Sequence, residues 1–119
     1  MKILHLTLKR RWFHMIASGE KKEEYREIKP YWIQRLTWHE FHKADSLTLL
    51  HNLANKKAIR TDYDAILFKN GYSKDAPKML VELKGIHYGY PAKQEWSDSK
   101  NQDWFFCLEL GEIKESYNI

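Results

Sequence analysis

The stretch KILHLTLKRRWFHMIASGEKKEEYREI, residues 2–28, carries two apolar patterns followed by a dense run of charges. Residues 3–8 alternate in the manner of a β-strand with at least one buried face. The segment RRWFHMIASG places its apolar residues at helical spacing, and Gly19 suits the end of a helix because it lacks a Cβ and adopts positive φ readily. The stretch therefore predicts a strand, a short helix ending at a glycine, and a second strand over residues 21–28.

The remaining elements follow from similar signals. Pro30 suits the first turn of another helix, where its missing N–H breaks no helical bond. Residues 40–62 lack strand alternation and predict a helical insertion, capped at Asp45 or Ser46. The apolar face of this insertion is expected to comprise Leu47, Leu50, Leu53 and Ala54. Further strands are expected over residues 63–69, 78–90 and 103–113, followed by a frayed tail. The sequence thus predicts an α+β fold, a small and mostly antiparallel β-barrel of about five strands with short flanking helices.

The composition is that of one soluble domain. With 119 residues, 43% of them hydrophobic, the chain can build one core, and we expect a single domain over residues 1–119. No apolar run approaches the roughly 20 residues of a membrane helix, so we expect a cytoplasmic protein without a membrane partner. A single cysteine, Cys107, cannot form a structural disulfide, and we expect it in the core. His39 and His42 lack the zinc-binding pattern, so no metal or other cofactor is expected.

The second strand carries a balanced run of charges. Strict alternation places on one face Lys22, Glu24, Arg26 and Ile28, and on the other Lys21, Glu23, Tyr25 and Glu27. Ile28 indicates the inward side and Tyr25 the outward side, so Glu24 and Arg26 are predicted to point into the barrel. Buried charges are costly unless they are paired or line a wet pocket, which favours a polar site. The alternative is that both faces are solvated and the charges belong to the surface.

One motif resembles a known family: Gly19-x-Lys21-x-x-Glu24-x-Arg26, placed after a strand and a short helix, is similar to the G-x-K-x-x-E-x-R signature of the ASCH domain. The ASCH family belongs to the PUA-like β-barrel superfamily. An Asn-Gly-Tyr loop, the long strand LVELKGI and a closing strand ending in Leu-Gly-Glu follow in the family's order. The resemblance covers most of the chain, apart from the helical insertion and the polar loop before the closing strand. It implies a PUA-like barrel whose mouth holds RNA or a nucleobase-like ligand.

The resemblance also implies candidate catalytic residues. A small bacterial branch of the family hydrolyses N4-acetylcytidine with a Lys, a Thr and a Glu. The lysine matches Lys21 and the glutamate matches Glu82, but Glu24 stands at the threonine position. A carboxylate is a poorer nucleophile toward an amide than an activated hydroxyl, which argues against the threonine mechanism. Glu24 and Glu82 together would instead keep one carboxyl protonated, leaving an acid and a base for hydrolysis.

The lysine of the motif is out of phase with its glutamate. Lys21 and Glu24 can reach one pocket only if Lys21 precedes the regular strand or a bulge lies at Lys22 or Glu23. Beside carboxylates, Lys21 is better suited to hold an anion or a carbonyl oxygen than to abstract a proton.

Basic and aromatic residues elsewhere indicate contacts to a polyanion. The first eighteen residues carry four basic side chains and no acidic one, so this end projects a positive field. The loop over residues 70–77 either grips a phosphate and stacks a base or is a plain connector. Trp96 lies in a polar loop with no evident core to join, which makes it a candidate lid or stacking residue. The contacts predicted outside the charged run are Lys9, Arg10, Arg11, Tyr72, Lys74 and Trp96.

These observations favour a monomeric RNA- or nucleotide-binding module. Its pocket is expected to contain Lys21, Glu24, Arg26 and Glu82, and its partner is RNA or a modified nucleoside or nucleotide. The alternative is a hydrolase of a modified nucleoside, of the N4-acylcytidine type, or a ribonuclease, using Lys21, Glu24 and Glu82. A third hypothesis is a protein-interaction domain, which predicts an exposed apolar patch in place of a charged pocket.

Overall fold

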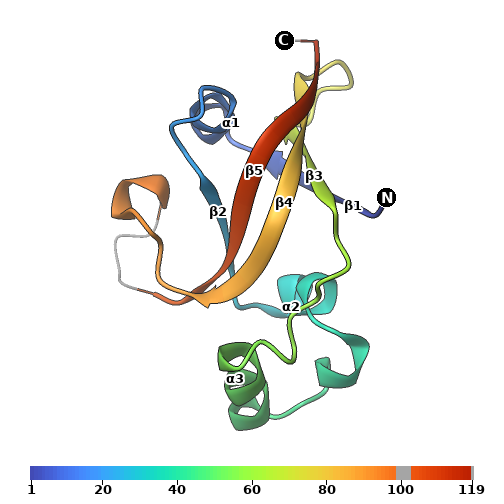
Figure 1. Ribbon diagram of the computed structural model, residues 1–119, viewed down its shortest axis with the longest axis vertical. Helices are drawn as coiled ribbons and strands as arrows, with labels where there is room; N and C mark the ends of the chain where they lie inside the picture. Colours follow the sequence, from blue (N-terminus) through green and yellow to red (C-terminus); the bar gives the residue numbers. More distant parts are fainter. Residues whose placement is uncertain (99–102, 119) are drawn as a thin grey trace. The chain divides into compact units, whose positions relative to one another are not determined.

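The structure, a computed structural model, describes residues 1–98 and 103–118. Figure 1 shows its strands and helices along the chain. In chain order, with η for a 3-10 helix, the elements are β1 (Ile3–Leu8), α1 (Arg10–Ala17), β2 (Glu23–Glu27), α2 (Pro30–Leu36), η1 (His39–Phe41), α3 (Ser46–Ala54), β3 (Ala65–Asn70), β4 (Lys78–Gly89), η2 (Gln94–Trp96) and β5 (Phe105–Tyr117).

The strands of the described residues form one sheet in the order β1-β3-β4-β5-β2. β1 and β3 are parallel, in register from Ile3 beside Ala65 to Leu8 beside Asn70. β3 and β4 are antiparallel, with Ala65 beside Glu82. A parallel neighbour needs a long crossover, and residues 9–64 provide it here. The predicted α+β fold, with five mostly antiparallel strands and short helices, is confirmed, while the PUA-like assignment stays a prediction.

The chain divides into two compact units. Unit 1 consists of Met1–Lys22, Asp62–Lys84 and Glu109–Ile119, and unit 2 of Glu23–Thr61 and Gly85–Leu108. β4 and β5 contribute residues to both units. The division also splits the charged motif, since its glycine and lysine fall in unit 1 and its glutamate and arginine in unit 2.

The core of unit 1 begins with β1 and α1. Along β1 every second residue is buried, and α1 buries residues at helical spacing, as the sequence predicted. These buried residues are Leu4, Leu6, Leu8, Trp12, Phe13 and Ile16. β3 and β4 add further buried side chains, among them Ile66, Phe68, Met79 and Val81. Full burial of such a side chain stabilises the fold by about 1.5–3 kcal/mol, so this core fixes α1 and the turn that follows it.

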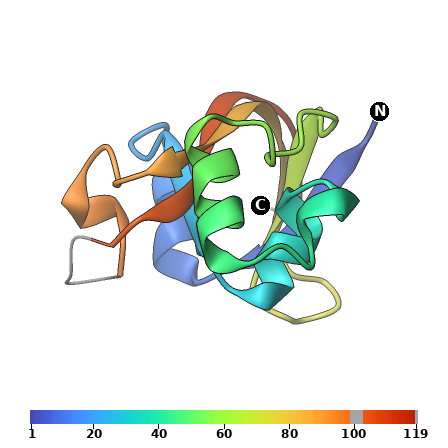
Figure 2. The same cartoon turned by 90° about the horizontal axis from the view of Figure 1, so that it is seen from below.

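Unit 2 carries α2 and α3, which lie at the same end of that unit in both views (Figure 1 and Figure 2). α2 begins at Pro30, as predicted. α3 begins after Asp45, whose carboxylate accepts the Thr48 N–H at 2.8 Å and so caps the helix. A bridge between Thr37 and Ile59 ties together the segments that follow the two helices. None of the helices in residues 1–98 and 103–118 is long and apolar enough to cross a membrane.

Two predictions about buried residues in unit 2 have different outcomes. Cys107 is fully buried, as expected, and its thiol donates to the Gly89 carbonyl at 3.5 Å. The predicted apolar face of α3 is wrong, because Leu53 is buried but Leu47 and Leu50 are exposed. Of the four predicted residues only Leu53, in the last turn of α3, is buried.

Some boundaries also differ from the prediction. β2 begins only at Glu23, because the preceding residues complete the turn that ends α1. The tail predicted to fray belongs to β5, which continues through Tyr117. The polar loop before β5 contains the short helix η2, and residues 99–102 of that loop lie outside the described residues.

Candidate functional site

The end of α1 places Lys21. Gly19 has a φ of 83°, the left-handed conformation that a residue without Cβ adopts at little cost. Its N–H donates to the Ile16 carbonyl at 3.0 Å, and the N–H of Lys21 donates to the Met15 carbonyl at 2.9 Å. These bonds wrap the chain around the helix end. Lys21 therefore precedes the regular strand, which is one of the two arrangements that the sequence left open.

The side chain of Lys21 turns back onto α1. Its Nζ lies 4.1 Å from the centroid of the Trp12 ring, in cation–π geometry, and the residue is only 2% exposed. The guanidinium carbon of Arg11 lies 4.4 Å from the same ring. A buried ammonium needs such partners to offset its lost hydration. Trp12 thus holds the position of two cations while remaining a core residue.

Lys21 and Glu82 line the same pocket of unit 1. The pocket has a volume of about 950 Å³ and is formed by the end of α1 with parts of β4 and β5. This volume is in the range, about 300–1,000 Å³, of small-molecule sites. Its charged lining residues are Lys21, Lys22, Lys84, Glu82 and Glu112. Ammonium groups donate to anions and carboxylates accept from N–H groups, so the lining offers both kinds of polar contact.

Glu82 is fixed by a close approach of two strands. Its Oε1 accepts the backbone N–H of Glu112 at 3.3 Å. A Cβ added to Gly111 would lie 1.9 Å from that same oxygen, so only glycine leaves room for the carboxylate. A carboxylate has about four acceptor positions, and one bond to Glu112 leaves capacity for a ligand.

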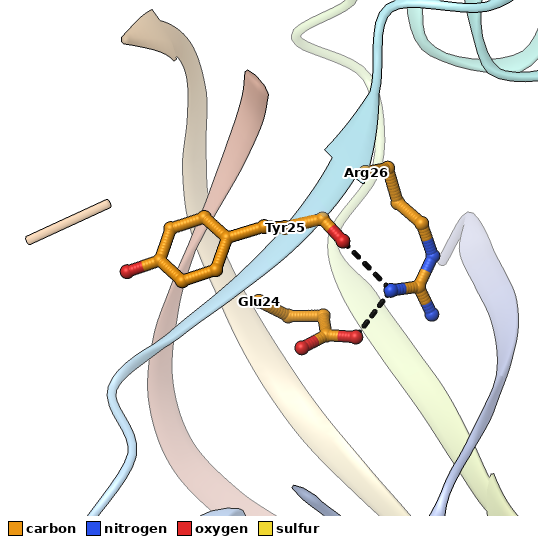
Figure 3. Close-up of polar contacts among 3 residues, drawn as sticks. All are labelled: Glu24, Tyr25 and Arg26. Carbon is orange, nitrogen blue, oxygen red and sulfur yellow. Dashed lines mark hydrogen bonds and ion pairs between the residues drawn. The ribbon is translucent and has the colours of Figure 1, made fainter. Parts of the chain in front are cut away.

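Glu24 and Arg26 form an ion pair in unit 2 (Figure 3). Nη1 of Arg26 donates to Oε2 of Glu24 and, at 2.8 Å, to the carbonyl of Tyr25. Glu24 is 3% exposed, and the side chain of Arg26 is 15% exposed. The two residues lie on one side of β2, as alternation predicted, and the guanidinium carbon lies 5.1 Å from the Trp32 ring. Both charged side chains are therefore largely buried, and the alternative that they belong to the solvated surface is wrong.

Tyr25 is buried, whereas the sequence predicted that it faces outward. Figure 3 shows its ring directed away from Glu24 and Arg26. Its hydroxyl donates to Glu23 at 2.7 Å and accepts the N–H of Ala92 at 3.1 Å. Burial, together with the hydrogen bond to Glu23, raises the pKa of Tyr25 far above its ordinary value. Glu23, Glu24 and Tyr25 are all buried, so side chains on both faces of β2 are shielded from solvent. Alternation therefore tells which residues share a face, but not which face is exposed.

The other predicted contacts of unit 1 lie at the opposite end of α1. This group, here called the basic end, comprises the exposed residues Lys9, Arg10, Arg11, Tyr72 and Lys74. It is held together because the N–H of Gly71 donates to the Leu8 carbonyl at 3.1 Å, which places the β3–β4 loop beside the start of α1. α1 has eight residues, so at 1.5 Å per residue its first residue lies about 10 Å from its last, while Arg11 of the basic end and Lys21 of the pocket both contact the Trp12 ring. The predicted contacts in unit 1 therefore lie at the two ends of α1, and the Trp12 ring connects the two ends.

Trp96 is buried, contrary to the expectation that it has no core to join. It lies in η2 of unit 2 and is 6% exposed, with Nζ of Lys93 5.3 Å from its ring. A polar sequence around a tryptophan does not exclude burial, because one turn of 3-10 helix is enough to direct the ring inward. In this position the ring offers little surface for stacking.

Sequence reasoning missed three charged residues of the pocket lining: Lys22, Lys84 and Glu112. Lys84 had a signal, because it lies two residues after Glu82 and side chains two apart share a face of a strand. The role of Gly111 had no local signal, because the clash that excludes a side chain there involves a residue of another strand.

No family model, curated protein or solved structure matches this chain. The resemblance to the ASCH family therefore stays an expectation from the motif and the order of the elements.

Proposed function

We propose that this chain binds RNA or a nucleotide through the pocket of unit 1. The observation that supports this function is that Lys21 and Glu82, which are 61 positions apart in the chain, line the same pocket. Lys21 is held by Trp12, and Glu82 is held by Glu112 and by the absence of a side chain at Gly111. A pocket with such prepared polar groups is suited to a polar ligand of defined shape.

The lining suits a nucleotide in its chemistry. Lysine side chains bind phosphate as point charges, and this pocket has three. Carboxylates accept hydrogen bonds from the amino and imino groups of bases. Glu82 would then recognise the base while Lys22 and Lys84 contact the phosphate. The basic end supports a ligand longer than one nucleotide, because it continues the cations of the pocket along α1, with Arg11 and Lys21 on the same Trp12 ring.

Equilibrium titration with nucleoside monophosphates and short RNA at several salt concentrations tests this function. We expect affinity to fall as salt rises. In a plot of the logarithm of the binding constant against the logarithm of the salt concentration, each phosphate contact to a single strand should contribute about −0.7 to the slope. Lys84→Ala, at an exposed pocket residue, should lower affinity and reduce the magnitude of that slope by about 0.7, the contribution of one contact. Glu82→Gln should change the preference among bases. No binding, or binding that salt and both substitutions leave unaltered, would reject the proposal.

A second candidate is hydrolysis of a modified nucleoside or of RNA. It is supported by an ammonium and a carboxylate in one pocket, where a carboxylate can serve as a general base toward water. Incubation with N4-acylated cytidines and with RNA, comparing the wild type with Glu82→Gln, separates catalysis from binding. Turnover that Glu82→Gln abolishes, with binding retained, supports the enzyme. Absence of turnover in the wild type leaves a binding module.

A further inference from the structure

Cationic and aromatic side chains form a continuous row along α2. The guanidinium carbon of Arg26 lies 5.1 Å from the Trp32 ring. The rings of Trp32 and Tyr31 pack edge to face, with centroids 4.7 Å apart. Finally, the guanidinium carbon of Arg35 lies 3.5 Å from the centroid of the Tyr31 ring. We call these four residues, all of which belong to unit 2, the α2 face.

The outer half of the α2 face is open to solvent. Tyr31 is 55% exposed, Arg35 is exposed and Trp32 is partly exposed. The inner half is fixed, because Arg26 is bound by Glu24 and by the Tyr25 carbonyl. The row thus runs from an anchored, nearly buried arginine to an accessible one.

Arg35 is already oriented for stacking. Its Nη1 donates to the Tyr31 carbonyl at 3.1 Å while its guanidinium covers the Tyr31 ring. Arginine planes and aromatic rings are the surfaces on which unpaired bases stack in single-stranded nucleic acids. A planar guanidinium held in place by a ring and a carbonyl loses little further freedom when a base stacks on it.

The charge of α2 indicates the class of ligand. From its N-cap, Lys29, to its last residue, Leu36, the segment carries two basic residues and no acidic one; Lys29 forms an ion pair with Glu27 at 3.0 Å, so Arg35 is the cation of the exposed part. An uncharged ligand would use the rings but gain nothing from the cations. We infer that the α2 face binds an unpaired base of single-stranded RNA, with Arg35 also close to the adjoining phosphate. This rests on the proposed function for the choice of RNA but concerns a different unit of the chain.

Fluorescence anisotropy with a labelled adenine RNA of about 12 nucleotides, a length within the known range of single-strand sites, tests the inference. We expect Tyr31→Ala and Arg35→Ala each to weaken binding about fivefold or more, the loss of at least one stacked base. Tyr31→Phe keeps the ring and should bind like the wild type. Arg35→Lys keeps the charge but not the plane, so it should lose affinity while its salt dependence stays unchanged.

The controls separate this surface from the pocket. Tyr117→Ala removes another exposed tyrosine and should leave affinity unaltered, and thermal melting confirms that each variant is folded. Wild-type affinity in both Tyr31→Ala and Arg35→Ala, with loss in Lys84→Ala, overturns the α2 face and leaves the pocket. A wild type that binds a mononucleotide but not the RNA also overturns the α2 face and leaves the pocket. A wild type that binds neither rejects both proposals.

Discussion

The carboxylate of Glu82 occupies the space that a side chain at position 111 would fill. A Cβ on Gly111 would lie 1.9 Å from Oε1 of Glu82, 2.8 Å from its Cδ and 3.1 Å from its Cβ. A different rotamer of Glu82 moves its Oε1 and Cδ away, but the third contact remains, since the Cβ of Glu82 is fixed by the backbone of β4. Two residues on different strands therefore have to be considered together, because glycine at one position sets where the carboxylate of the other can lie.

Gly111→Ala should displace Glu82 and strain the β4–β5 contact. Overpacking of this kind destabilises proteins by about 1–3 kcal/mol. We expect a loss of that size in urea unfolding, together with weaker nucleotide binding. In a Glu82→Ala background the same substitution should cost less, because two of the three close atoms are gone. An equal cost in both backgrounds would contradict the proposed coupling.

Gly19→Ala should affect both stability and the pocket, whereas Gly71→Ala should affect stability alone. Both glycines have φ near 80°, a region that costs other residues about 1–2 kcal/mol. Only Gly19 belongs to the turn that places Lys21. Unfolding curves should therefore show similar losses, while mononucleotide affinity falls only in Gly19→Ala. Unchanged mononucleotide affinity in Gly19→Ala would show that the turn is not what positions Lys21.

Tyr25→Phe removes a buried hydroxyl that bonds Glu23 and Ala92. Leaving such partners unsatisfied costs about 1–3 kcal/mol, which denaturant unfolding at neutral pH should detect. The ordinary pKa of the group is 10.0 and the folded state raises it. The folded state therefore holds this proton more tightly, so wild-type stability declines as the pH rises above about 10, by up to about 1.4 kcal/mol per pH unit.

The phenylalanine variant lacks that contribution. Its disadvantage relative to the wild type should therefore shrink as the pH rises above about 10. Tyr88 and Tyr117 also have raised pKa values, but both proteins retain them, so the comparison isolates Tyr25. A difference in stability that stays constant up to pH 11 would contradict a raised pKa at this position.

The parts of the fold that sequence predicted are those set by neighbouring residues. The alternation in β1, the helical spacing in α1 and the capping role of Asp45 are local patterns, and all appear in the structure. The burial of Tyr25 and of Trp96 depends on segments distant in sequence, and the sequence predicted neither. Pairing Lys21 with Glu82 rested on the family motif, because nothing local links a helix end to the middle of β4.

Asp45 should make α3 sensitive to acid. Its carboxylate accepts the backbone N–H and the hydroxyl of Thr48, and these bonds hold its pKa below the ordinary value of 3.8. A lowered carboxyl pKa stabilises the folded state above the unfolded pKa, and this contribution is lost as the pH falls through the folded pKa. Protection of the α3 amides, which is the exchange rate compared with the intrinsic rate at each pH, should therefore fall below about pH 4.

Two substitutions at this cap separate charge from hydrogen bonding. Asp45→Asn keeps a good capping acceptor without a titrating group, so its exchange should lack the acid-dependent step. Asp45→Ala should accelerate exchange at every pH. The cap has no role in the acid response if Asp45→Asn retains the wild-type pH profile.

Arg26→Ala should destabilise the protein strongly, because the buried carboxylate of Glu24 loses its arginine partner. Removing one member of a buried ion pair costs about 3–5 kcal/mol, whereas replacing both members with apolar residues of similar volume costs much less. Urea unfolding should therefore find Glu24→Leu/Arg26→Met more stable than Arg26→Ala. The double variant is also a control for RNA binding, because it lacks the guanidinium but keeps a stable fold. If Arg26→Ala binds RNA poorly and the double variant binds it well, the loss reflects a weakened fold. If both bind poorly, the guanidinium itself contributes to binding. Arg26→Ala at wild-type stability would show that Glu24 does not depend on Arg26.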